Sequence, residues 1–182
     1  MATRPALVRL VGDASDQIVH DNLFSQGFKL APALAERTVR RYATARQFRD
    51  VEIELYRDAA WDAQGGFIRI ELRALVHPMQ QALVGAPQSL LTPQPGVQIS
   101  QFQLGPHPDH SPGSWRVRGP ADVGALATGL VAYLRDVAVP WLRHTESLDA
   151  VLDHLADLGQ LEQRDRLIEA LDRAGHRAKM TP

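Results

Sequence analysis

The sequence predicts an α+β fold in which an antiparallel sheet of four or five strands is covered on one face by a long helix. Apolar and polar residues alternate over residues 50–56 and 66–76, which is the period of a half-buried strand. The turn-rich stretch between these two strands has no room for a crossover helix, so we expect them to be antiparallel neighbours. An apolar stretch over 121–138 is long enough to lie across the sheet.

The alternation also predicts which face of the sheet is apolar and which is charged. Val51, Ile53 and Leu55 fall on one side of their strand, together with the apolar residues of the next strand. The opposite face carries glutamates and arginines that can pair across an antiparallel ladder. We therefore expect one face to be buried and the other to be charged and at least partly exposed.

Three further segments have strand character. Residues 37–45 predict a first strand, 97–104 a fourth and 114–118 a short fifth strand around Trp115. The stretch from Lys29 to Glu36 is interpreted as a connection.

Helices are predicted at both ends of the chain. The first begins near Pro5, has a potential interruption at Gly12 and should stop at Gly27, because glycine accepts the positive φ found just past a helix end. A short helix is expected over 77–84. Two C-terminal helices follow Ser147, a suitable cap, and Leu161.

The long apolar helix carries two glycines and meets a proline. Gly124 and Gly129 each lower helix propensity, so we expect them to let the helix approach the strands closely. Pro140 is expected to kink or end the helix, because it lacks a backbone N–H and clashes with the preceding turn.

Composition narrows the functional classes. At 182 residues, 45% of them hydrophobic, we expect one α+β domain over 1–182 with frayed ends. Twenty basic and 21 acidic residues give a net charge of −1, so a nucleic-acid partner is not indicated. The chain has no cysteine, which excludes disulfides and thiol chemistry. The N-terminus resembles neither a secretion signal nor a membrane span, so a cytoplasmic protein without a membrane partner is expected.

Four short motifs follow one another along the chain. They are Gly27-Phe28, the arginine-bearing strand at Val39-Arg40, the tryptophan strand at Ser114-Trp115 and the helix end Val139-Pro140-Trp141-Leu142. In this order the elements resemble a bacterial family of uncharacterised small α+β domains, over about residues 17–156. The resemblance implies a bacterial protein with a sheet of antiparallel strands and implies no enzymatic activity.

The densest group of potential metal ligands is His107-Pro108-Asp109-His110. Two imidazoles and a carboxylate within four residues are ligand types that zinc accepts. A metal-dependent hydrolase that uses His107, Asp109 and His110, with Glu52 or Glu54 as a further group, is therefore the alternative function. No cofactor is expected otherwise, although this loop allows a divalent metal.

The leading hypothesis is a soluble protein-interaction module without enzymatic activity. The sequence lacks a phosphate loop, a nucleophile elbow, a His-Glu-x-x-His motif and a dinucleotide fingerprint. The candidate partner-binding residues are Trp61, Arg69, Arg73, Arg40 and Glu54. We expect Trp61 to be an exposed anchor in the turn between two strands, and the three arginines to share the charged sheet face. A homodimer formed through an edge strand is a further alternative.

Overall fold

The structure is a computed structural model that describes residues 4–45, 49–62, 64–77, 103–104 and 113–173. Four predictions therefore lie wholly or almost wholly outside the described residues. They are the short helix over 77–84, the strand residues 97–102, the loop that contains His107, Asp109 and His110, and the frayed ends.

The fold is α+β, as the sequence predicts. The helices are α1 (Arg4–Leu23), α3 (Pro120–Tyr133), α4 (Val139–Arg143), α5 (Leu148–Asp157) and α6 (Leu161–Arg173). The strands are β1 (Lys29–Ala31), β2 (Thr38–Ala45), β3 (Arg49–Arg57), β4 (Gly66–Val76), β5 (Gln103–Leu104) and β6 (Ser114–Val117). The sequence analysis missed β1, which lies in the stretch interpreted as a connection.

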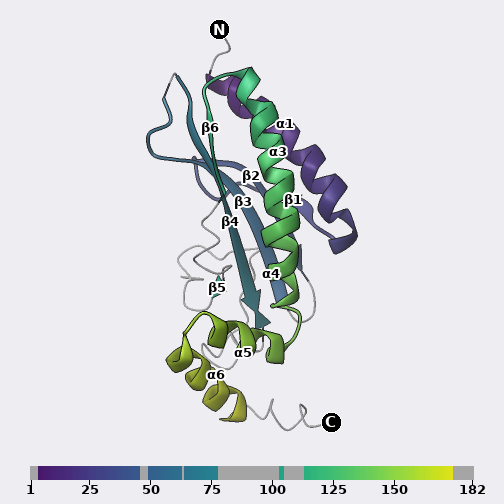
Figure 1. The fold of residues 1–182 in the computed structure, drawn as a ribbon, viewed down its shortest axis with the longest axis vertical. Coiled ribbons are helices and arrows are strands. Elements are labelled where there is room, and N and C mark those ends of the chain that lie inside the picture. Colours follow the sequence, from purple (N-terminus) through teal and green to yellow (C-terminus); the bar gives the residue numbers. More distant parts are fainter. Residues whose placement is uncertain (1–3, 46–48, 63, 78–102, 105–112, 174–182) are drawn as a thin grey trace.

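The described strands form one antiparallel sheet in the order β1-β2-β3-β4 (Figure 1). The far edge of β4 pairs with β6 at its beginning and with β5 at its end. Tyr42 of β2 lies opposite Ile53 of β3, which in turn lies opposite Leu72 of β4. These three residues therefore share one face of the sheet. The same register determines which of the two faces each remaining side chain of the central strands occupies.

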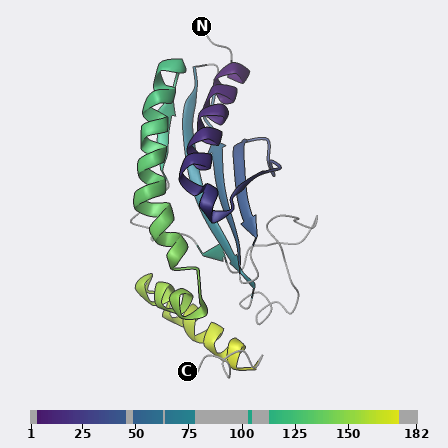
Figure 2. The same cartoon turned by 90° about the vertical axis from the view of Figure 1, so that its right-hand side faces the viewer.

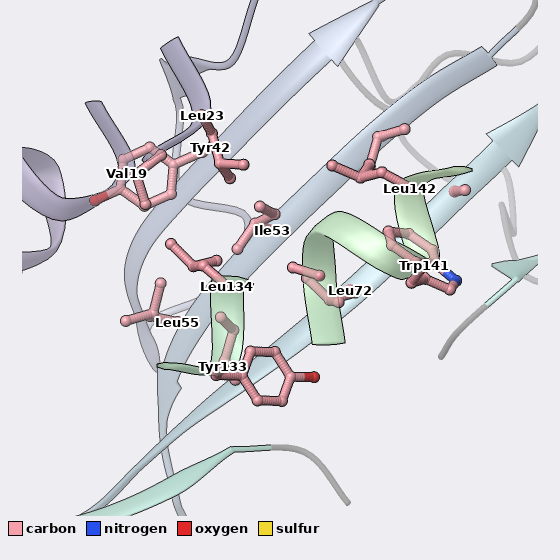
Figure 3. Packing of buried hydrophobic residues seen from close by; sticks show 14 of the residues in the cluster. Val19, Leu23, Tyr42, Ile53, Leu55, Leu72, Tyr133, Leu134, Trp141 and Leu142 are labelled. Carbon is pink, nitrogen blue, oxygen red and sulfur yellow. The ribbon is translucent and has the colours of Figure 1, made fainter. Parts of the chain in front are cut away.

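Two helices cover this apolar face. Figure 2 shows α1 and α3 side by side along the sheet, and both run in the same direction. The core lies between the helices and the strands, and Figure 3 shows part of it. It contains Val19 and Leu23 of α1, Tyr42 of β2, Ile53 and Leu55 of β3, Leu72 of β4, Tyr133 of α3 and Leu134 just after it.

The ends of α1 follow the sequence prediction. The helix continues without interruption through Gly12, and a single 3₁₀ turn over Phe24–Gln26 follows it. Gly27 has a φ of 78°, in the left-handed region that favours glycine. Phe28 is buried in the core immediately afterwards.

Pro140 does not end the long helix. A π turn over Leu134–Ala138 comes directly before α4, and the N–H of Val139 donates to the carbonyl of Leu134 across this wider turn. The helix therefore runs on to Arg143. Because a π turn widens the helix locally, it accommodates the proline ring that an ordinary α turn would exclude.

Only one of the two glycines in α3 lets the helix approach the sheet. A Cβ on Gly129 would lie 2.0 Å from the indole nitrogen of Trp115 in β6, so glycine is required there. A Cβ on Gly124 would meet no atom of the described residues within 4 Å. The prediction is confirmed for Gly129 and is wrong for Gly124, which lies on the side of α3 that faces away from the sheet.

The last two helices lie beyond the end of the sheet at which α4 ends (Figures 1 and 2). Ser147 caps α5, since its hydroxyl accepts a hydrogen bond from the N–H of Ala150 at 3.2 Å. Gly159, with a φ of 69°, follows the end of α5. The predicted serine cap is therefore confirmed.

Candidate protein-interaction surface

The face of the sheet that turns away from α1 and α3 carries the charged residues of the central strands. We call it the outer sheet face. In β3 it comprises Glu52, Glu54 and Tyr56, which alternate with the core residues. In β4 it comprises Phe67, Arg69, Glu71 and Arg73.

One half of the outer sheet face is a buried ionic network. Glu52 receives a hydrogen bond from the Nε of Arg41 at 2.6 Å, and the side chains of both residues are at most 1% exposed. Arg73 of β4 forms ion pairs with both Glu52 and Glu54. Thr38 donates its hydroxyl to the second oxygen of Glu54 at 2.5 Å.

This network corrects the expectation that the glutamates face solvent. Two arginines and two glutamates balance in charge, so the network neutralises itself. Burial of such groups costs free energy that only close ion pairs and hydrogen bonds offset. Of the predicted partner-binding residues, Glu54 and Arg73 are therefore already engaged within the chain.

The other half of the outer sheet face is accessible. Phe67 is 39% exposed, although it is a large apolar residue in the middle of a charged face. Tyr56, diagonal to it across β3 and β4, is partly exposed. Arg69 lies directly opposite Tyr56, and Arg116 of β6 lies directly opposite Phe67. We call Tyr56, Phe67, Arg69 and Arg116 the aromatic–arginine patch.

The two arginines of this patch differ from those of the network. Neither Arg69 nor Arg116 forms an ion pair or a side-chain hydrogen bond with the residues that the structure describes. Glu71 is exposed beside them. The patch with Glu71 thus carries one more positive than negative charge, and its guanidinium donors are available.

The tyrosine of the patch stays neutral at ordinary pH. Partial burial raises the pKa of Tyr56, and the nearby carboxylate of Glu71 raises it further, whereas Arg69 lowers it. The phenol is therefore protonated and can donate a hydrogen bond to an acceptor that lies over the patch.

Arg40 does not belong to the outer sheet face. The register places it on the same side as Tyr42, against α1. Its Nε donates to both carboxylate oxygens of Asp16, at 3.1 and 3.0 Å, and its guanidinium covers Gly12. The prediction that Arg40 shares a face with Arg69 and Arg73 is wrong, because its strand alternates with the apolar side facing the helix.

Trp61 is not an exposed anchor. The side chain is 6% exposed and belongs to the core, although it lies in the turn between β3 and β4. Its ring packs against Gly66, where a Cβ would lie 3.2 Å from the indole. The turn folds the tryptophan inward, so polar neighbours in the sequence gave a misleading signal.

Two of the patch residues could have been found from sequence. Phe67 and Tyr56 alternate with core residues, which places two aromatic rings among the charged side chains. Arg116 could not have been found in this way. Its position depends on the long-range pairing of β6 with β4, in which 48 residues separate Phe67 from Arg116.

A second exposed region surrounds β1, at the edge of the described sheet. Phe24, Leu30 and Leu34 are exposed there. An open hollow of about 570 Å³ lies beside the strand, with a lining mostly of small residues such as Gly27, Ala31 and Ala43. The homodimer through an edge strand stays a prediction.

Within the described part of the chain, no group of three or more His, Asp or Glu residues is placed to hold a metal ion. The loop with His107, Asp109 and His110 is outside that part, so the metal site also stays a prediction.

Comparison of the chain with protein-family models, curated proteins and solved structures finds no match. The resemblance to a bacterial family therefore stays a prediction as well.

Proposed function

We propose that this chain is a protein-interaction module that binds a partner through the aromatic–arginine patch. The observation that carries the proposal is the exposure of Phe67 between Arg69 and Arg116, two arginines without an ion pair among the described residues. Tyrosine and arginine are the residue types that dominate binding energy at protein interfaces, and aromatic rings supply a large contact area at low entropic cost.

The chemistry of the patch favours an acidic partner segment with an apolar side chain. Phe67 and Tyr56 offer an apolar centre, and Arg69 and Arg116 offer donors for carboxylates on either side of it. The buried network next to the patch fixes Arg73, Glu52 and Glu54. It therefore holds the neighbouring strands rigid, which reduces the entropy lost on binding.

The test compares the wild type with a variant in which the patch is altered at two exposed positions. Phe67→Ala with Arg116→Glu removes the apolar centre and reverses one charge. Each chain is immobilised, and the proteins that it retains from an extract of the source cell are measured by quantitative mass spectrometry. We expect the partner that the wild type retains to be absent from the patch variant.

The matched control makes the same two kinds of change elsewhere. Leu161 and Arg166 are exposed on α6, so Leu161→Ala with Arg166→Glu should retain the wild-type partners. If the patch variant keeps all of them while both variants unfold like the wild type, the patch is not the binding surface and the proposal fails.

A further inference from the structure

The helix α3 has an exposed apolar face that the other described elements leave uncovered. Figure 2 shows α1 on one side of α3, while the other side of α3 faces outward. The exposed positions of α3 follow the alternating spacing of three and four residues typical of a helix-pairing seam. They are Pro120, Ala121, Gly124, Ala125, Thr128 and Val131, and the same stripe continues to Arg135 in the π turn.

The helix has more apolar surface than one copy of the chain buries. Residues Pro120–Arg143 form a continuous helix that is long and apolar enough to cross a membrane, yet only 28% of its most apolar window is buried. Val131 is 37% exposed. A helix that is apolar around its whole circumference is normally covered on all sides.

Two residues of the stripe favour packing of a second helix on this face. Gly124 costs helix stability, and no contact among the described residues explains it, since none of their atoms lies within 4 Å of a Cβ placed there. The hydroxyl of Thr128 donates to the carbonyl of Gly124 at 3.1 Å, so its hydrogen bond is made within the helix itself. Glycine and a satisfied threonine let two helix backbones approach closely.

The charges at the ends of the stripe are self-complementary. Arg118 and Asp122 form a partly exposed ion pair of the chain at its beginning, at 3.9 Å, and Arg135 and Asp136 form an exposed one at its end, at 2.6 Å. In an antiparallel pair of helices with the two-fold axis at Thr128, Arg135 of one copy lies beside Asp122 of the other. The same arrangement brings Asp136 near Arg118 of the second copy.

We propose that the chain forms a two-fold symmetric homodimer in which the outer face of α3 packs antiparallel against α3 of a second copy, centred on Thr128. The interface is isologous, so each contact occurs twice. It leaves the outer sheet face accessible in both copies, because α3 lies on the opposite side of the sheet. The proposal is therefore independent of the patch and of its partner.

The absence of cysteine allows a direct test of the axis. Thr128→Cys introduces the only thiol of the chain. In the proposed dimer the two-fold axis places this thiol next to the same thiol of the second copy. We expect mild oxidation to give a disulfide-linked dimer on a non-reducing gel. Gln17→Cys, on the exposed side of α1, is the control and should crosslink at least about tenfold more slowly.

Sedimentation equilibrium measures the same interface without a crosslink. The wild type should be a dimer, and Thr128→Arg should raise the dissociation constant at least about tenfold. Asp136→Arg and Arg118→Glu should each weaken the dimer through like-charge repulsion, and the double variant should restore it. Circular dichroism checks that each variant is folded.

Three outcomes would overturn the proposal. The first is a wild type that remains monomeric at about 100 μM. The second is a dimer whose dissociation constant is unchanged by Thr128→Arg, which would place the interface elsewhere, for example at β1. The third is a monomer that cosediments with phosphatidylcholine vesicles and loses this binding on Thr128→Arg, which would assign the face to a lipid surface.

Discussion

Glu52 is buried on the outer sheet face, where its carboxylate faces the guanidiniums of Arg41 and Arg73. A charge in this position is stable only while its partners are present, because the protein interior replaces the water that would otherwise solvate it. The side chain therefore fixes β2, β3 and β4 relative to one another. It also explains why a strand that looks solvated from its alternation is buried on both faces.

We predict that Glu52→Gln destabilises the fold by about 3–5 kcal/mol, the range observed when one member of a buried ion pair is removed. The substitution keeps the size of the side chain but leaves Arg41 buried without the negative charge of Glu52. Denaturant unfolding at neutral pH measures the effect. Glu71→Gln is the control, since Glu71 is exposed on the same face and its loss should change stability by no more than about 0.5 kcal/mol. Equal effects of the two substitutions would contradict this account of the network.

At the scale of the element, α3 has two glycines with opposite surroundings. Gly129 faces the indole of Trp115, which also makes an edge contact with Tyr133 at a centroid distance of 6.2 Å. Gly124 faces away from the rest of the described structure. The same substitution at these two positions therefore separates the packing contribution from helix propensity.

We predict that Gly129→Ala destabilises the fold by about 1–3 kcal/mol, because the new methyl group overpacks the Trp115 contact. Gly124→Ala should stabilise the isolated chain by about 0.5–1 kcal/mol through helix propensity alone. Thermal unfolding, at a protein concentration at which sedimentation finds only monomer, measures both. A destabilising Gly124→Ala under these conditions would show that the outer side of α3 is not open.

The elements predicted from sequence are those whose signal is local. The alternation in β3 and β4, the glycine after α1 and the serine before α5 act through their immediate neighbours, and each is confirmed. Trp61 and Arg40 were misplaced because their surroundings come from distant residues, namely the fold-back of a turn and the carboxylate of Asp16. The aromatic–arginine patch was found only in part for the same reason, since Arg116 reaches it through long-range strand pairing.

At the scale of the whole molecule, the helices and the sheet are joined by polar contacts as well as by the core. Tyr42 of β2 donates its phenol to Asp16 of α1 at 2.7 Å, and Arg40 pairs with the same carboxylate. Tyr133 of α3 is buried over β6 beside Trp115. Each tyrosine thus lies between a helix and the sheet, and ionisation of either would place a charge inside the contact between the two layers.

This arrangement predicts that the protein loses stability in alkali. Burial raises the pKa of Tyr133 to about 12, and burial together with the hydrogen bond to Asp16 raises that of Tyr42 strongly. In the unfolded chain both phenols lose their protons near pH 10, so above this pH the unfolded state binds fewer protons than the native state. The stabilising contribution is therefore fully present below about pH 10 and is lost as the pH rises toward the native pKa values.

We expect the free energy of unfolding to fall by about 1–3 kcal/mol between pH 8 and pH 11, as measured by urea denaturation. Tyr42→Phe with Tyr133→Phe should remove most of this slope and leave the part due to Tyr56, whose pKa is also raised. A double variant with the same alkaline slope as the wild type would show that the two phenols are not buried between the layers.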